Sequence, residues 1–273
     1  MLIADAHVHI HDCFDLARFL SAAFCNFRHA ALQIKCDRTY VPVLCLAEGR
    51  GQRVFQRLSG DMEKGKDAIG QGNGEIFRFY PTGEPESLRI ENAERQSLFL
   101  VSGRQIVTAE RLEVLALSTV SEIPDGLPLE KTVGVVEKEG ALPVVPWGFG
   151  KWSGKRGDVL REFLATRKEG VFFLGDNGGR PNVLRFPDFQ RSPAGDSLKV
   201  LPGSDALPLP SEQKKVGSFG FALQGELDVR RPGEGLKRIL LKPGAAPIPY
   251  GSPERISRFA WNQMVLRIWK HRI

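Results

Sequence analysis

The sequence predicts an α/β fold in which seven or eight strand–helix units form one distorted barrel with a small antiparallel β insertion. The main observation is an alternation of elements in the second half: helix-like segments at about 128–139 and 156–168 precede apolar strands at 142–145 and 171–174. This alternation is typical of parallel βαβ units. The connections are short and continuous, and 273 residues suit one α/β barrel. We therefore expect a single domain over 1–273.

The first half begins with a buried strand, in which Leu2, Ile3, Ala6, Val8 and Ile10 are the apolar positions. Residues 15–32 then have the apolar spacing of a helix. Residues 40–47 predict a second buried strand, and 60–75 predict a glycine-rich loop. Short alternating runs near 76–80, 87–91 and 97–101 then predict an antiparallel β excursion over 76–107.

The end of the chain, 253–273, has the spacing of a basic amphipathic helix. Such a helix can touch a membrane or nucleic acid, but the more common arrangement, which we expect here, buries its apolar face and closes the barrel.

The composition indicates a globular protein with a sizeable core, since 42% of residues are hydrophobic and 26% are charged. No apolar run approaches about 18 residues, so we expect no membrane-spanning helix. The start of the chain lacks the basic and then apolar regions of a signal peptide, so we expect a cytoplasmic protein. Four cysteines without CxxC spacing predict reduced, mostly buried thiols. The net charge of +6 weakly favours acidic partners.

Three of the five histidines, His7, His9 and His11, lie within five residues of one another. Because His7 and His9 are two apart on a predicted strand, both imidazoles should leave the same face. Two such imidazoles can bind one metal ion. The competing interpretation is a pair of histidines that are simply hydrogen-bonded.

Polar residues also stand at the carboxyl ends of other predicted strands, where a parallel barrel places its functional groups. They are Glu48, Gln105, Trp147 with Lys151, Asp176 and Asp205. For any one carboxylate alone, a helix N-cap or a loop turn is an equally good interpretation.

Five segments, in this order, resemble motifs of the PHP (polymerase and histidinol phosphatase) family, which is related to the amidohydrolases. Asp5-Ala6-His7-Val8-His9 matches the opening D-x-H-x-H. Residues 43–49 stand where the family has an apolar strand ending in T-D-H, and 102–108 with 112–117 resemble its P-G-x-E-x-T…H-x-L segment. Residues 140–147 stand where the family has a strand ending in A-H-P, and 203–207 resemble its closing G-S-D-A-H. The resemblance spans about 1–220. It implies a barrel of PHP/amidohydrolase (TIM-like) type that hydrolyses phosphoesters with two or three divalent metals.

This chain departs from the pattern at several ligand positions: Gly49 and Leu207 replace histidines, as do Glu113 and Trp147, and Gln105 replaces a bridging glutamate. The metal ligands that remain, by resemblance or as replacements, are His7, His9, Glu48, Glu113, Asp176 and Asp205. They predict a reduced site with a Zn, Mn or Fe ion, one ion rather than two or three.

Two glycine-containing turns add candidate substrate-binding groups. The turn around 147–156 offers Lys151 to an anion and Trp147 to a ring, and the turn around 174–181 offers Arg180 to an anion. Rigid loops with solvated charges explain both turns equally well.

Two functions follow. The first is a metal-dependent hydrolase, which the resemblance makes a phosphoesterase, in which Asp205 orients or deprotonates a water molecule. The second is a PHP-like barrel without catalysis that binds a ligand or a partner protein. We expect a small anionic substrate or ligand, no membrane partner and no nucleic acid.

Overall fold

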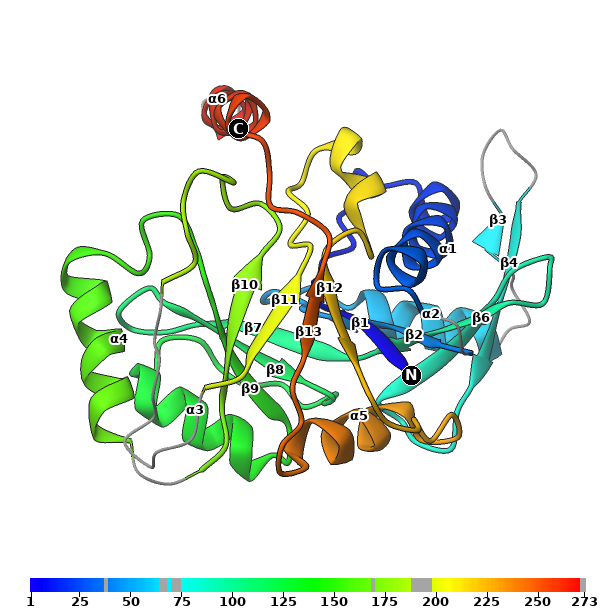
Figure 1. Ribbon diagram of the computed structural model, residues 1–273, viewed down its shortest axis with the longest axis horizontal. Helices are drawn as coiled ribbons and strands as arrows, with labels where there is room; N and C mark the ends of the chain where they lie inside the picture. The colour runs from blue at the N-terminus through cyan, green and yellow to red at the C-terminus, as the bar shows by residue number, and fades with distance from the viewer. Residues whose placement is uncertain (37–38, 64–67, 70–74, 168–169, 188–197, 271–273) are drawn as a thin grey trace.

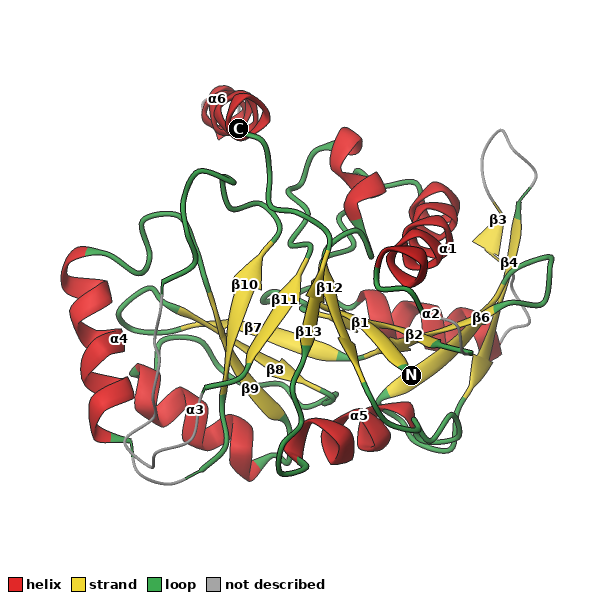
Figure 2. Ribbon diagram, in the orientation of Figure 1, coloured by secondary structure: helices red, strands yellow, loops and turns green. Residues whose placement is uncertain are grey.

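The computed structural model of the chain describes residues 1–36, 39–63, 68–69, 75–167, 170–187 and 198–270 (Figure 1). Its strands form two sheets (Figure 2). The larger sheet has the strand order β13-β12-β1-β2-β6-β5-β4-β3. In chain order its strands are β1 (Leu2–Val8), β2 (Val41–Leu46), β3 (Ala68–Ile69), β4 (Ile76–Pro81), β5 (Ser87–Glu91), β6 (Ser97–Val101), β12 (Gly220–Leu223) and β13 (Ile248–Tyr250).

The smaller sheet has five strands in the order β11-β10-β9-β8-β7. They are β7 (Gly103–Val107), β8 (Glu113–Leu117), β9 (Leu142–Pro146), β10 (Phe173–Asn177) and β11 (Val200–Gly203). Strands β9, β10 and β11 are parallel, whereas β7 and β8 are antiparallel to their neighbours. The described helices are α1 (Leu16–Gln33), α2 (Val54–Glu63), α3 (Leu129–Lys138), α4 (Gly154–Thr166), the 3-10 helix η1 (Pro210–Lys215), α5 (Pro232–Leu241) and α6 (Ile256–Lys270).

The fold is mixed α/β, but the prediction of a closed TIM-like (β/α)7-8 barrel is wrong. Strand β6 is paired with β2 on one edge and with the antiparallel strand β5 on the other. It therefore has no free edge for β7, the next strand along the chain. At the other end, β1 is already paired with β2 and β12, so β11 lies beside it without a ladder. At the first junction a single bridge joins the sheets, since the N–H of Glu48, just after β2, donates to Gly103 (3.1 Å) and its carbonyl accepts the N–H of Gln105 (2.8 Å). At the second, the N–H of Asp205 donates to the His7 carbonyl (2.8 Å). These isolated contacts form no ladder, so the two sheets stay open.

Residues 76–107 contain the antiparallel pairs β4–β5 and β5–β6, and then β7. No helix lies within this stretch, which the structure describes throughout. These added strands occupy the edge that a barrel would need for closure.

Three hydrophobic clusters fill the spaces between the two sheets and the helices that cover them. One lies between the larger sheet and helices α1 and α2, the second between the two sheets and α5, and the third between the smaller sheet and helices α3 and α4. Strand β2 shows the arrangement, because Val43 and Cys45 face the smaller sheet while Leu44 and Leu46 face α1. Both faces of the strand are buried, which explains its continuous apolar sequence.

None of the four cysteines, all of which the structure describes, forms a disulfide; Cys45 is buried and the other three are partly exposed. Burial raises the pKa of the Cys45 thiol. In the part of the chain that the structure describes, no helix has both the length and the apolar character needed to cross a membrane.

Candidate metal centre

The two histidines leave β1 where the strand becomes irregular. The register between β1 and β2 shifts by one residue between Asp5 and Val8, a β-bulge. A bulge turns later side chains to the opposite face. Consequently Ala6 and His7 are both directed between the sheets, while Val8 packs on the side of α1. The bulge therefore directs His7 toward the space shared with β7, β10 and β11.

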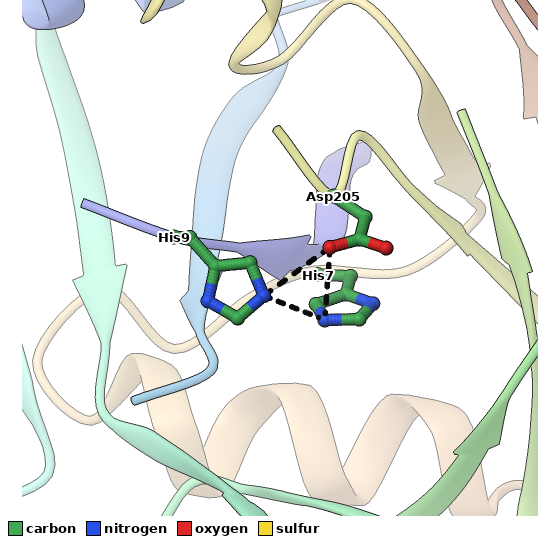
Figure 3. A group of neighbouring side chains, drawn as sticks. All are labelled: His7, His9 and Asp205. Carbon is green, nitrogen blue, oxygen red and sulfur yellow. Dashed lines mark hydrogen bonds and ion pairs between the residues drawn. The ribbon is translucent and has the colours of Figure 1, made fainter. Parts of the chain in front are cut away.

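His7, His9 and Asp205 converge on one point (Figure 3). Nε2 of His7 lies 3.0 Å from Nε2 of His9, and Oδ1 of Asp205 lies 3.2 Å from His9 Nε2 and 3.6 Å from His7 Nε2. His7 is buried, and the side chains of His9 and Asp205 are 10% and 24% exposed. The centre is thus mostly enclosed and remains open to solvent at one side.

The loop after β11 holds Asp205 in an unusual backbone conformation. Its φ of +43° lies in the left-handed region, which non-glycine residues rarely adopt. The backbone N–H of Asp205 donates to the carbonyl of His7 (2.8 Å), which ties this loop to β1. Gly203 passes so close to His7 that a side chain at this position would overlap the His7 backbone.

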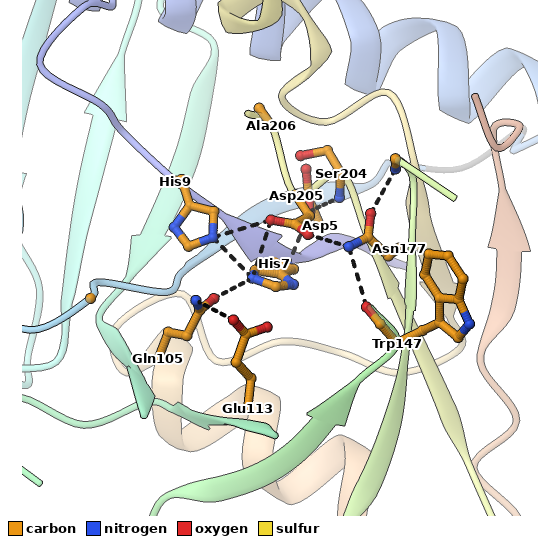
Figure 4. A network of polar contacts seen from close by, with 12 residues as sticks. Asp5, His7, His9, Gln105, Glu113, Trp147, Asn177, Ser204, Asp205 and Ala206 are labelled. Carbon is orange, nitrogen blue, oxygen red and sulfur yellow. Dashed lines mark hydrogen bonds and ion pairs between the residues drawn. The ribbon is translucent and has the colours of Figure 1, made fainter. Parts of the chain in front are cut away.

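Asp5 holds the same loop through hydrogen bonds to its carboxylate (Figure 4). Its carboxylate is fully buried and accepts the backbone N–H groups of Ser204 (2.8 Å), Gly217 (2.8 Å) and His7 (3.2 Å). Burial raises the pKa of Asp5 to about 6, although these hydrogen bonds act in the opposite direction. Its role is therefore to position the strand carrying His7 and the loop carrying Asp205.

The electrostatics of His7 and Asp205 suit cation binding. Burial lowers the pKa of His7, so its imidazole is neutral at pH 7 and has a free lone pair. Burial alone would raise the pKa of Asp205, but His7, His9 and a hydrogen bond from Asn177 outweigh it and hold this pKa below its usual range. Two imidazoles and one carboxylate are a common ligand set for a divalent transition metal.

The spacing of these atoms fits one ion. Metal–ligand bonds of about 2.0–2.1 Å at tetrahedral angles place ligand atoms about 3.3 Å apart. The three separations in the structure, 3.0, 3.2 and 3.6 Å, lie around this value. In addition, Nδ1 of His7 is buried without a hydrogen-bond partner, so the polar contacts of its ring are made by Nε2, which faces the cluster.

An arm of polar residues reaches the centre from β7 and β8 (Figure 4). Oε1 of Gln105 lies 2.9 Å from His7 Nε2, and Nε2 of Gln105 donates to Glu113 (3.3 Å). Glu113 in turn forms an ion pair with Lys151. The structure therefore brings Gln105, Glu113 and Lys151 to the edge of the centre, with the Gln105 oxygen turned toward the histidines.

Asn177 supports the centre from β10. Its Nδ2 donates to the second oxygen of Asp205 and lies 3.4 Å from the backbone oxygen of Trp147. Its own oxygen accepts the N–H of Gly179 (2.7 Å), which fixes the orientation of the amide. This arrangement holds Asp205 with its other oxygen directed at the histidines.

Four of the residues predicted for the site lie elsewhere. Asp176 is on the other face of β10 and forms a two-fold ion pair with the buried Arg180 (both 2.8 Å). Glu48 accepts the N–H of Phe55 at the start of α2 (3.0 Å) and lies 3.5 Å from Arg104. The ring of Trp147 packs in the cluster beneath α3 and α4. Glu48 and Asp176 therefore do not join the triad, and neither Trp147 nor Arg180 faces it.

Sequence reasoning missed the supporting roles of Asp5 and Asn177. A usable signal existed for Asn177: Phe173, Gly175 and Asn177 share one face of β10, and Phe173 packs between the sheets. Alternation would therefore have selected Asn177 over Asp176. His11 was also left without a role; its ring stacks on His9, and its Nε2 lies 2.9 Å from the Ala206 carbonyl.

The fold and the site together define a mixed α/β protein with a possible His/Asp metal centre at the junction of its two sheets. No family model matches the chain, and no curated protein matches it in sequence. Among solved structures, PsfC from Pseudomonas syringae PB-5123 is similar, with 16% identity, a TM-score of 0.50, and coverage of 96% of this chain and 98% of that one.

A second similar structure is that of the lesion-specific endonuclease PfuEndoQ from Pyrococcus furiosus. Its identity is 12% and its TM-score 0.51, and the match covers 91% of this chain. The present chain spans 58% of the length of that endonuclease. At these identities both likenesses concern the fold alone.

Proposed function

We propose that the chain is a PHP-type metal-dependent hydrolase with a reduced site, in which one divalent ion is held by His7, His9 and Asp205. The observation that carries this proposal is the convergence of their three ligand atoms, all within 4.8 Å of one another. Two arguments support it further: the D-x-H-x-H and G-S-D-A-H resemblances supply these same three residues, and the fold is similar to that of an endonuclease.

A bound divalent ion would supply positive charge that makes a water molecule more acidic and stabilises an anionic transition state. His7 and His9 hold their Nε2 atoms toward this point, and Gln105 adds a neutral oxygen beside His7. Asp205 would hold the ion through Oδ1 and so help to orient the attacking water, while Asn177 holds the other carboxylate oxygen in place.

For the substrate class we propose a small phosphoester. Lys151 is the predicted anion-binding residue that lies beside the centre, paired with Glu113 and 29% exposed. An anionic substrate would compete with Glu113 for its ammonium group. Arg180 is less suited to binding a substrate anion, because its guanidinium group already donates two hydrogen bonds to the carboxylate of Asp176 inside the fold.

The second candidate is a ligand-binding protein of the same fold without catalysis. It is favoured by the engagement of Glu48 and Asp176 in other contacts and by the packing of Trp147, which leave few extra ligands near the triad. Neither Trp147 nor Leu207 can ligate a metal through its side chain. The two candidates share the metal centre and differ in whether substrate turns over.

The test is the metal content of protein purified without chelator or nickel column, together with hydrolysis of p-nitrophenyl phosphate and bis(p-nitrophenyl) phosphate. We expect about one ion per chain and weak hydrolysis. His9→Ala should lose both, because it removes one of three ligands. His29→Ala, which changes an exposed histidine on α1, is the matched control and should keep both.

The outcomes separate the candidates. Metal that depends on His9 without any hydrolysis would favour the binding protein. Hydrolysis that persists in His9→Ala would place the activity at another site. Two or more tightly bound ions with brisk turnover would contradict the reduced centre.

A further inference from the structure

Helix α6 carries an exposed apolar stripe on the side that faces away from the protein. Ile256, Ala260, Met264 and Ile268 are spaced by four residues, and Trp261 lies beside them. All five are exposed, and Trp261 is 60% exposed. The sequence-based expectation that this helix buries its apolar face is therefore wrong for these residues.

The helix is held to the rest of the molecule by its opposite side. Asn262 is buried and donates to Glu212 of η1 (3.3 Å), and Arg258 also reaches Glu212 (3.1 Å). The ring of Phe259 contacts Phe149 at 5.0 Å between centroids. Figure 1 shows α6 apart from both sheets, at the top of the view. The stripe is thus presented outward by contacts that fix the orientation of the helix.

The charge on this helix has one sign. From 255 to the end of the sequence there are basic residues and no acidic ones. Arg255, just before the helix, and Arg267 are exposed, and Arg258 is 48% exposed although it contacts Glu212 and Glu254. An apolar face with a tryptophan and flanking arginines has the composition of helices that lie in the interface of an anionic membrane.

Against the sequence-based expectation of no membrane partner, we propose that α6 docks this chain onto an anionic lipid surface, with Trp261, Met264 and Ile268 among the acyl chains and the arginines at the headgroups. A second copy of the chain fits this face less well, because pairing two α6 helices would bring only positive charges together. Nucleic acid would use the arginines and leave four large apolar side chains in water. The proposal is independent of the metal centre and of the proposed hydrolysis.

The loop of the candidate site lies next to this surface. Phe149, itself 59% exposed, contacts Phe259 of α6 and lies two residues from Lys151. Lys151 pairs with Glu113 at the edge of the centre. Docking through α6 would therefore bring a lipid surface close to this loop.

The test is co-sedimentation of the full chain with vesicles of phosphatidylcholine alone and of phosphatidylcholine with about 30% phosphatidylglycerol. We expect binding to the anionic vesicles at least about fivefold stronger than to the neutral ones. The double variant Trp261→Ala/Met264→Ala should weaken binding about tenfold. Arg255→Glu/Arg267→Glu should remove the preference for anionic vesicles.

Matched controls lie elsewhere on the surface. Leu32→Ala/Val229→Ala removes exposed apolar side chains outside α6, and Arg57→Glu reverses an exposed charge on α2; both should bind as the parent does. Because all the changed residues are exposed, circular dichroism melts should agree among the variants.

Three results would overturn the proposal. One is absence of any preference for anionic vesicles. Another is a dimer in solution that the Trp261→Ala/Met264→Ala variant dissociates, without lipid binding, which would assign the stripe to a second copy. The third is binding to duplex DNA that depends on Arg267 and not on Trp261.

Discussion

At the scale of single residues, Asp5 connects the two parts of the candidate centre. One buried carboxylate accepts N–H groups from β1, from the loop after β11 and from Gly217. The loop and the strand are about 200 residues apart in the sequence. One of these amides belongs to His7 itself, and another belongs to Ser204, which directly precedes Asp205. A change at Asp5 should therefore affect both stability and metal binding.

We predict that Asp5→Ala lowers the free energy of unfolding by at least about 3 kcal/mol, because three buried N–H groups lose their acceptor. Asp5→Asn should cost less, since one oxygen still accepts from two of them. Urea unfolding followed by circular dichroism measures both. Asp158→Ala, at a carboxylate that is 69% exposed, should stay within about 0.5 kcal/mol of the parent. Equal stability of Asp5→Ala and the parent would show that these hydrogen bonds do not hold the loop.

At the level of the strands, the backbones of β11 and β1 approach each other so closely at Gly203 that a side chain there would not fit. Gly203 makes this approach possible, because any Cβ atom there would overlap backbone and side-chain atoms of His7. The contact brings the loop of Asp205 next to the histidines. The alternation of each strand then decides which residues reach the centre, as Asn177 and Asp176 show on β10.

We predict that Gly203→Ala destabilises the fold by at least about 2 kcal/mol, since rigid backbone must move to admit the methyl group. The matched control is Gly134→Ala in α3, where a methyl group meets nothing within 4 Å. That change should stabilise the protein by about 0.5–1 kcal/mol through the lower backbone entropy of the unfolded chain. Thermal and urea unfolding of the two variants should shift in opposite directions. A stable Gly203→Ala variant that keeps its metal would contradict the close packing of β1 and β11.

At the scale of the whole molecule, the candidate centre joins the two open sheets. His7 and His9 come from the larger sheet, whereas Asp205 follows the edge strand of the smaller one. An ion held between them would link parts of the fold that share no ladder at this point. Binding to the folded state alone adds stability by mass action.

We predict that Zn²⁺ or Mn²⁺ at about a hundredfold excess over its Kd stabilises the protein by about 2.7 kcal/mol. This corresponds to a rise in Tm of about 5 °C or more for a chain of this size. Differential scanning fluorimetry with added metal, and after treatment with EDTA, would measure the shift. His9→Ala should melt at the same temperature with and without metal, whereas His29→Ala should follow the parent. A metal-dependent shift in His9→Ala as large as that of the parent would place the ion elsewhere.

The sequence alone determined most of the local structure. The spacing of apolar residues predicted the strands that became β1, β2, β9 and β10, because a strand buried on both faces needs a continuous apolar run. The pairing of His7 with His9 followed from their separation of two residues, and Asp205 followed from the resemblance of its segment to a family motif. These are inferences that depend on a few neighbouring residues or on a motif.

How the sheets end and which polar residues meet depend on contacts between segments that are far apart in the sequence. Strand β5 occupies the edge of β6 that a barrel would have needed, and strand pairing between distant segments leaves no local pattern in either segment. The bulge in β1 and the alternation of β10 likewise set the facing of His7, Asn177 and Asp176. One step in register moves a side chain to the other face of a sheet, so a strand predicted correctly can still present the wrong residue to the site.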